Sequence, residues 1–371
     1  MARLVRRLRL VPVAAAAALA LVALPACSSQ AAKPRQVPFG WMGVLAGPPI
    51  GDPARRGLTD GEVRTMATSG VESLRVAFYW REGQPNGPGA TDFAPYDRIV
   101  GTAARNRIAL LPTVLGVPPW ARVRKSNPAS SPAHPADFAR FMAALVDRYG
   151  PRGSFWRQHR DIPKRPIRLW QLWNEPDHIV YWREQPYYKR YVALIAAARV
   201  AIRRRDRGAK VVLAGLVGKS WVQLAQIYRA GGRRHFDYLA VHPFTRLLPD
   251  VVRIVRYNRT VATRFGDARK PMLVTELTWP SSKGKIRRPS AFDRTERNQA
   301  TLLDAAFRAL AVRRVKLRIR AVYWATWLTR DRSRTDAFDY TGLSALRANG
   351  TIRRKPAFYS FRATARRLEG R

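Results

Sequence analysis

The sequence predicts an α/β protein with one domain, because strand-like apolar runs alternate with longer helical patterns from residue 37 onward. Strands are expected, in chain order, at residues 37–45, 71–80, 108–115, 167–173, 211–217, 238–241, 271–275 and 321–327. Helices are expected between and after them, at residues 59–69, 95–106, 135–149, 187–205, 221–230, 249–265, 294–314 and 357–368. Regular alternation indicates a parallel sheet, and eight such units predict a (β/α)8, or TIM, barrel.

An open, doubly wound sheet is the alternative arrangement of these elements. It would usually place a glycine-rich phosphate loop after the first strand. The sequence there is Gly40-Trp41-Met42-Gly43, which matches no dinucleotide or P-loop fingerprint. Residues 150–166 form a longer insertion before the fourth strand, and we expect Phe155 and Trp156 to pack it down. Neither an internal repeat nor a second domain boundary is evident.

The N-terminus has the pattern of a secretory signal. Four arginines precede an apolar stretch at residues 10–24, which is too short for a comfortable membrane span. The stretch ends in Leu24-Pro25-Ala26-Cys27, which resembles a bacterial lipobox, although Pro25 departs from the usual small residue. The resemblance implies a signal peptide at 1–27, lipidation of Cys27, a tether at 28–38 and a barrel at 39–371. The protein would then be extracellular or in the cell envelope, lipid-anchored to the bacterial membrane. Ordinary secretion with an incidental cysteine is the alternative.

The chain is strongly basic, with a formal net charge of +43 over 371 residues. Removal of residues 1–27 would take away four arginines and no acidic residue, leaving +39. Such a charge favours acidic polymers, anionic lipid head groups or nucleic acid as partners. Biased coding composition would produce the same arginine-rich pattern. The single cysteine, Cys27, excludes an intramolecular disulfide.

Two glutamates stand where an expected strand gives way to a loop. Glu175 follows the fourth strand in Trp173-Asn174-Glu175-Pro176, and Glu276 follows the seventh in Thr275-Glu276. Chemistry in a (β/α)8 barrel takes place at the C-terminal ends of the strands. Strands four and seven face each other across the barrel mouth, so the two carboxyl groups could flank a glycosidic bond. One would donate a proton to the leaving oxygen while the other attacks the sugar.

These motifs resemble the retaining glycoside hydrolases of clan A, which include cellulase-like, β-xylosidase-like and α-iduronidase-like families. The resemblance runs from about residue 37 to 368 and implies that Glu175 is the acid/base and Glu276 the nucleophile. It also implies that Arg75 orients the nucleophile, that Asn174 bonds the sugar 2-hydroxyl, and that His242 is the strand-six histidine.

Aromatic residues at strand ends are expected to stack on sugar rings. Trp327, or else Trp324, matches the tryptophan that floors the sugar site in this clan, and Trp80, Trp120 and Trp182 are further candidates. Two departures stand out. The segment after strand three lacks the usual histidine, and Phe244 replaces a tyrosine that contacts the nucleophile, for which Tyr79 or Tyr323 could substitute.

The sequence therefore predicts a retaining glycoside hydrolase that cleaves β-type bonds of an oligo- or polysaccharide. No cofactor is expected, and no metal, because the histidines lack zinc-ligand spacing. A monomer is expected, acting on a carbohydrate with no specific nucleic acid partner. Cationic loops after strands three and seven could recognise an anionic glycan, although a solvated rim explains them equally well. The rival functions are a non-catalytic carbohydrate-binding barrel at the cell surface and a basic protein that binds envelope or anionic polymers.

Overall fold

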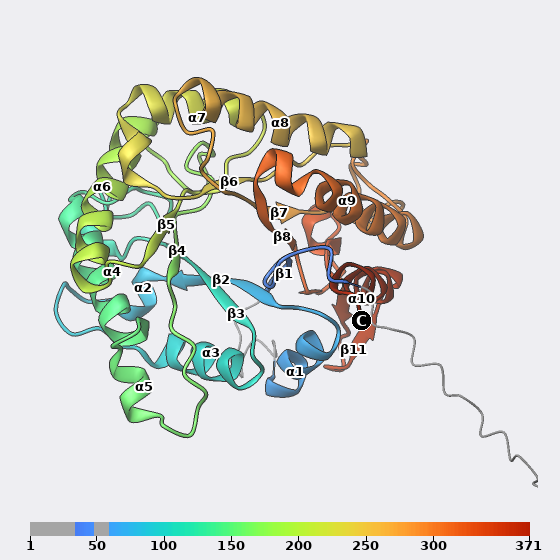
Figure 1. The fold of residues 1–371 in the computed structure, drawn as a ribbon, viewed down its shortest axis with the longest axis horizontal. Helices are drawn as coiled ribbons and strands as arrows, with labels where there is room; N and C mark the ends of the chain where they lie inside the picture. The colour runs from blue at the N-terminus through green and yellow to red at the C-terminus, as the bar shows by residue number, and fades with distance from the viewer. Residues whose placement is uncertain (1–33, 48–58) are drawn as a thin grey trace, which may run out of the picture. The chain divides into compact units, whose positions relative to one another are not determined.

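The structure is a computed structural model that describes residues 34–47 and 59–371. Its main sheet has eight strands in the order β5-β4-β3-β2-β1-β8-β7-β6, all of them parallel. Bridges between Val212 and Tyr238 and between Leu216 and Val241 connect the two edges. The sheet thus closes on itself, with its helices arranged around it (Figure 1), and the predicted (β/α)8 barrel is confirmed.

All eight barrel strands fall within or beside the expected ranges. Their bounds are β1 Met42–Leu45, β2 Ser73–Tyr79, β3 Ala109–Leu115, β4 Leu169–Leu172, β5 Lys210–Val212, β6 Leu239–Val241, β7 Met272–Leu277 and β8 Ile319–Trp324. The expected signal peptide, Cys27 and most of the expected tether lie outside the described residues.

The eight expected helices are also present. They are α1 Asp60–Thr68, α3 Ala94–Arg105, α4 Pro135–Tyr149, α6 Tyr188–Arg205, α7 Ser220–Arg229, α8 Leu248–Arg264, α9 Glu296–Leu317 and α10 Pro356–Glu369. Proline in the first turn begins α3, α4, α8 and α10, where its missing N–H costs no helical hydrogen bond. Threonine hydroxyls cap α1 and α9. None of the described helices is long and apolar enough to cross a membrane.

Several short elements were not expected from the sequence. The helix α2 (Trp80–Gly83) follows β2, and α5 (Ser154–Gln158) lies in the insertion before β4. Phe155 and Trp156 of α5 are buried, as predicted for that insertion. Between β8 and α10 the chain forms a second sheet of three strands, β9 Leu328–Thr329, β10 Ser344–Leu346 and β11 Ile352–Arg354.

The interior of the barrel changes from apolar to polar along the strands. A separate buried cluster comprises Leu111, Val212, Ala240, Leu273, Ala321 and Tyr323, contributed by five strands. Two residues further along three of these strands stand Thr113, His242 and Thr275, and alternate residues of a strand point to the same face. The C-terminal end of the barrel interior therefore offers polar groups above an apolar layer.

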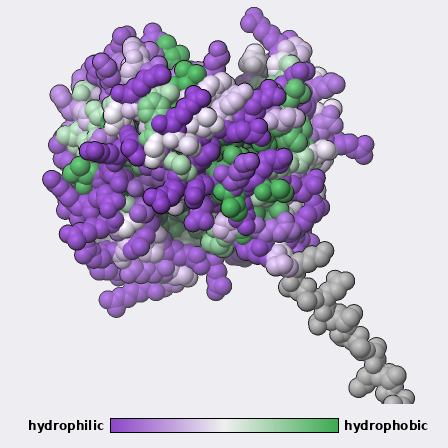
Figure 2. Space-filling model, turned by 45° about the horizontal axis from the view of Figure 1, so that its top comes forward, coloured by the Kyte–Doolittle hydropathy of each residue, from purple (hydrophilic) through white to green (hydrophobic). Residues whose placement is uncertain are grey.

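The surface reflects the composition. Hydrophilic residues cover most of the face shown in Figure 2, with hydrophobic residues gathered in smaller groups between them.

Candidate active site

Glu276 is held at the end of β7 by an ion pair with Arg75 of β2. Nη1 of Arg75 lies 2.6 Å from Oε1 of Glu276, and both side chains are largely shielded from solvent. The pairing of β7 with β8 shifts register between Val274 and Leu277, and such an irregularity re-aims the side chains beside it. The ion pair stabilises negative charge on Glu276, which is the form a nucleophile requires.

Arg75 is itself fixed by amide oxygens from strand four. Its Nε donates to Oε1 of Gln171 at 2.6 Å, and its Nη2 donates to Oδ1 of Asn174 at 2.7 Å. Gln171 also accepts from the Thr113 hydroxyl and donates to the Leu213 carbonyl. Gln171 is fully buried, and this polar residue in an apolar strand was the available sequence signal for its role.

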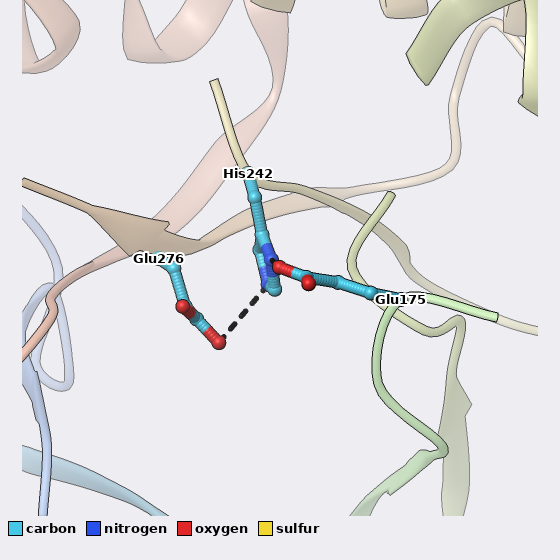
Figure 3. Close-up of side chains that lie close together, drawn as sticks. All are labelled: Glu175, His242 and Glu276. Atoms are coloured by element: carbon cyan, nitrogen blue, oxygen red, sulfur yellow. Dashed lines mark hydrogen bonds and ion pairs between the residues drawn. The ribbon is translucent and has the colours of Figure 1, made fainter. Parts of the chain in front are cut away.

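His242, at the end of β6, stands between the two glutamates (Figure 3). Its Nδ1 lies 2.6 Å from Oε1 of Glu175, and its Nε2 lies 3.7 Å from Oε1 of Glu276. Burial lowers the pKa of His242 to about 4, so the ring is neutral near pH 7. Gly215, after β5, makes room for the ring, because a Cβ there would lie 1.9 Å from Nε2.

Glu175 is placed by a strained loop after β4. Trp173 and Glu175 itself have φ of 78° and 41°, in the left-handed region that side chains rarely adopt. The Glu175 N–H donates to the Gly215 carbonyl, and Asp177 accepts from the Val217 N–H, which ties this loop to the one after β5. Burial raises the pKa of Glu175 to about 7, opposed by the positive charge of Arg75.

The two carboxyl groups therefore differ in environment. Glu175 is buried beside a neutral imidazole, which favours its protonated form. Glu276 instead forms an ion pair with the Arg75 guanidinium. One proton donor and one carboxylate facing the same space can carry out acid-assisted displacement at a carbon atom.

Glu175, His242 and Glu276 also form a possible metal-ligand set among the described residues, since their ligand atoms lie within 4.8 Å of one another. The positively charged guanidinium of Arg75 lies 2.6 Å from the same Glu276 oxygen, so it would repel a metal cation bound there. The donor set therefore fits a proton-transfer site better than a metal centre.

The structure places three of the expected sugar-stacking tryptophans in the core. Trp80, Trp182 and Trp327 are at most 1% exposed, so no ring face is free to meet a ligand. Trp327 packs on Phe358 of α10 and donates to Glu62 of α1. The expectation that these three contact sugar is wrong, because hydrophobic packing takes up their rings.

Trp120 is the exception, since it remains partly exposed in the loop after β3. It packs edge-on against Trp80 and donates to the Gln84 carbonyl. The alternative floor residue, Trp324, is also fully buried and donates to the Thr341 carbonyl.

Two aromatic residues not among the expected sugar contacts, Tyr181 and Phe244, interact with the residues of the site. Tyr181 is 37% exposed. The pKa of its phenol is raised by burial and by the nearby charges of Glu175 and Glu276. Phe244 contacts the His242 ring and packs edge-on against Phe338, in the loop region after β8. Tyr323 does not replace the missing tyrosine, because its hydroxyl pairs with Ser73 at 2.7 Å.

No protein-family model matches the chain, and no curated protein matches it. Solved structures do match the chain. A family 39 glycoside hydrolase from Bacteroides cellulosilyticus WH2 aligns with a TM-score of 0.65 at 18% identity, over 90% of this chain. A glucosidase from Croceicoccus marinus aligns with a TM-score of 0.64 at 16% identity, over 91% of this chain and 69% of that one. A family 51 α-L-arabinofuranosidase from Bifidobacterium longum aligns with a TM-score of 0.59 at 13% identity, over 90% of this chain and 74% of that one.

The chain spans 64% of the length of the Bacteroides enzyme, so that protein contains regions without a counterpart here. At these identities the likeness establishes the barrel fold, which is shared with glycoside hydrolases of families 39 and 51.

Proposed function

We propose that the protein is a glycoside hydrolase with Glu175 as acid/base and Glu276 as nucleophile. The observation that carries the proposal is the arrangement of the two carboxyl groups. They follow or end strands β4 and β7, their oxygens approach within 4.8 Å, and they differ in contacts: Glu276 pairs with Arg75, whereas burial raises the pKa of Glu175 to about 7.

The spacing also favours retention of anomeric configuration. Retaining enzymes hold their carboxyl groups roughly 5–5.5 Å apart, whereas inverting enzymes leave roughly 6.5–9.5 Å for a water molecule. In the first step Glu276 attacks the anomeric carbon while Glu175 gives its proton to the leaving glycosidic oxygen. In the second step Glu175 takes a proton from water, whose oxygen attacks the anomeric carbon and releases Glu276.

Asn174 is available to bind the sugar. Its Oδ1 accepts from Arg75, which fixes the amide, and its Nδ2 makes no hydrogen bond with the described residues, so it can donate to a substrate hydroxyl. A bond of this kind to the 2-hydroxyl would strengthen in the transition state. A β-linked oligo- or polysaccharide is the substrate class that we propose.

The test is a panel of cyclic epoxide and 2-fluoro-sugar inactivators of different sugar configuration, followed by peptide mass spectrometry. We expect one configuration to label Glu276, and the labelled configuration identifies the sugar. Glu276→Ala should abolish labelling. Glu175→Gln should lower turnover by roughly 10²–10⁴-fold on natural glycans, the usual contribution of acid–base catalysis.

Added azide should partly rescue Glu175→Ala on aryl glycosides, since azide needs no general base and an activated leaving group needs no acid. Near-normal turnover in both glutamate variants would overturn the assignment. Glycan binding without turnover by the unmodified protein would favour the non-catalytic carbohydrate-binding barrel.

We further propose that the protein is secreted and anchored through lipidated Cys27. The proposal is supported by the arginines, the apolar stretch and the lipobox-like Leu24-Pro25-Ala26-Cys27 of the sequence. We expect Cys27→Ser to move the protein from the membrane fraction to the medium. Unchanged fractionation would contradict the anchor.

A further inference from the structure

Two arginines lie in loops at the C-terminal ends of β2 and β3, the same end of the barrel as the glutamates, and the charge of one acts on the other. Arg81 lies in α2, directly after β2, and its backbone N–H donates to the Gly116 carbonyl that follows β3. Arg122 lies further along the loop after β3. This loop is fixed against α2 because Trp120 donates to the Gln84 carbonyl at 2.8 Å. The two arginines are therefore held by neighbouring, interlocked loops.

Arg122 is buried with neither an ion pair nor a full set of hydrogen bonds among the described residues. It is 8% exposed, and it donates from Nε to the Val117 carbonyl and from Nη1 to the Lys125 carbonyl, each at 3.0 Å. Nη2 makes no hydrogen bond within the described part of the chain, and no carboxylate there pairs with this guanidinium. Burial and the positive charge of Arg81 both lower the pKa of Arg122.

The other buried cations of the described structure are neutralised or fully bonded. Arg75 pairs with Glu276, and Lys355 pairs with Asp331 at 3.2 Å. Arg259 makes five hydrogen bonds to backbone carbonyls. A buried cation beside another cation is costly unless an anion neutralises it. Arg122 thus has neither the ion pair of Arg75 and Lys355 nor the full set of hydrogen bonds that Arg259 makes.

Arg81 connects this pair to the catalytic centre. Its guanidinium carbon lies 4.1 Å from the centre of the Tyr79 ring, and it forms no ion pair with any described residue. Tyr79 in turn interacts electrostatically with Tyr181. The charges of Glu175 and Glu276 both raise the pKa of Tyr181. The two tyrosines are partly exposed. Tyr181 and Tyr79 thus lie between the glutamates and the guanidinium group of Arg81 in this chain of interactions.

Building on the glycosidase function proposed above, we propose that Arg81 and Arg122 bind an anionic group of the substrate, so that the enzyme acts on acidic glycans. The group would be a carboxylate or a sulfate on a sugar unit near the bond that is cleaved. Guanidinium groups recognise both through paired, charge-assisted hydrogen bonds. Partly exposed Trp120 and Tyr79 would provide apolar faces for the same sugar unit.

The test measures binding in the Glu175→Gln background, which keeps the Arg75–Glu276 ion pair and strongly slows turnover. The probe is a glycan array in 150 mM NaCl in which each neutral oligosaccharide is paired with its uronate and its sulfated counterpart. We expect the anionic members of at least one pair to bind about tenfold more tightly than the neutral member, the size of one charge-assisted hydrogen bond. The uronate and sulfate arms tell the two groups apart.

Two variants separate this site from the general positive charge of the protein. Arg81→Gln should remove the preference for anionic members. Arg204→Gln removes the same charge from an exposed position in the last turn of α6, at the opposite end of the barrel, and should leave it intact. Arg122→Lys keeps the charge but loses the planar fork, and should weaken the preference with the circular dichroism spectrum unchanged.

Equal binding of neutral and anionic members, or no binding of any anionic member, would overturn the inference. An equal loss in Arg204→Gln would also overturn it. The outcome is independent of catalysis. Anionic preference without hydrolysis would keep the inference and refute the glycosidase. Hydrolysis of glycans together with equal binding of the neutral and anionic members would do the reverse.

Discussion

Glu175 is the residue at which burial and catalysis are most directly linked. Its pKa is raised to about 7 because burial disfavours the carboxylate. As a general acid, Glu175 works only when it is protonated, so we expect kcat/KM to fall as the pH rises through about 7. A pH–rate profile with an aryl glycoside checks this, and Glu175→Gln should lose this alkaline limb while the barrel stays folded. A limb that persists in the variant would assign it to another group.

Gly215 offers a test of how the histidine is positioned. A Cβ at this residue would lie 1.9 Å from Nε2 of His242, so Gly215→Ala must push the ring away from Glu175. We expect kcat/KM to fall roughly 10²-fold, the effect of a displacement of about 1 Å at a catalytic centre.

A matched control is available in α1, where a Cβ at Gly61 meets no atom closer than 3.7 Å. Gly61→Ala should therefore retain full activity, as measured with the same aryl glycoside. Unchanged kinetics in Gly215→Ala would show that the contact between His242 and Glu175 is dispensable.

The chemical residues were predictable from the sequence because they stand at strand ends in specific motifs. Glu175, Glu276, Arg75, Asn174 and His242 all meet in one cluster. The tryptophans were not predictable, since a ring at a strand end packs into the core as readily as it lines a cleft. Sequence position gives the end of the barrel but not the side-chain direction.

At the scale of elements, the alternating pattern predicted the eight barrel strands and the eight helices. The observed ends of these elements differ from the predicted ends by a few residues. The β9–β10–β11 sheet was missed because its strands have only two or three residues each, too few to show periodicity. Closure of the barrel was likewise inferred from the count of units, since no local pattern encodes contact between β5 and β6.

A buried lysine at the start of α10 is tied to the loop between β9 and β10 of this small sheet. Lys355, between β11 and α10, is fully buried, donates to the Tyr340 carbonyl at 2.9 Å and pairs with Asp331. Burial lowers the pKa of Lys355 to about 8. Removal of one member of a buried pair leaves an unpaired charge, so Lys355→Ala should lower the free energy of unfolding by about 3–5 kcal/mol.

Denaturant unfolding at pH 7 measures this loss, and Lys355→Met combined with Asp331→Leu should recover most of it. The pH dependence has a definite sign. The unfolded lysine binds more protons than the folded one between about pH 8 and 10.5, so this residue's contribution to stability rises with pH in that window. Equal stability of Lys355→Ala and the parent protein would show that the Lys355–Asp331 pair does not stabilise the fold.

At the scale of the whole molecule, charge is the dominant physical feature. With 68 basic and 25 acidic residues, the chain cannot pair most of its cations. Like charges that remain on a compact surface repel one another, and salt screens this repulsion over about 10 Å at 0.1 M ionic strength. We therefore expect the melting temperature to rise by several degrees between 20 mM and 500 mM NaCl.

Chloride is the appropriate anion for this experiment, because sulfate could occupy the Arg81–Arg122 pair and stabilise the protein by binding. A melting temperature that falls with NaCl would mean that ion pairs such as Arg354–Glu62 and Arg199–Asp237 outweigh the repulsion. Comparison of the two salts at equal ionic strength then separates screening from binding. Extra stabilisation by sulfate that Arg81→Gln removes and Arg204→Gln preserves would come from the arginine pair, whereas stabilisation that survives in both variants would belong to the charge of the molecule as a whole.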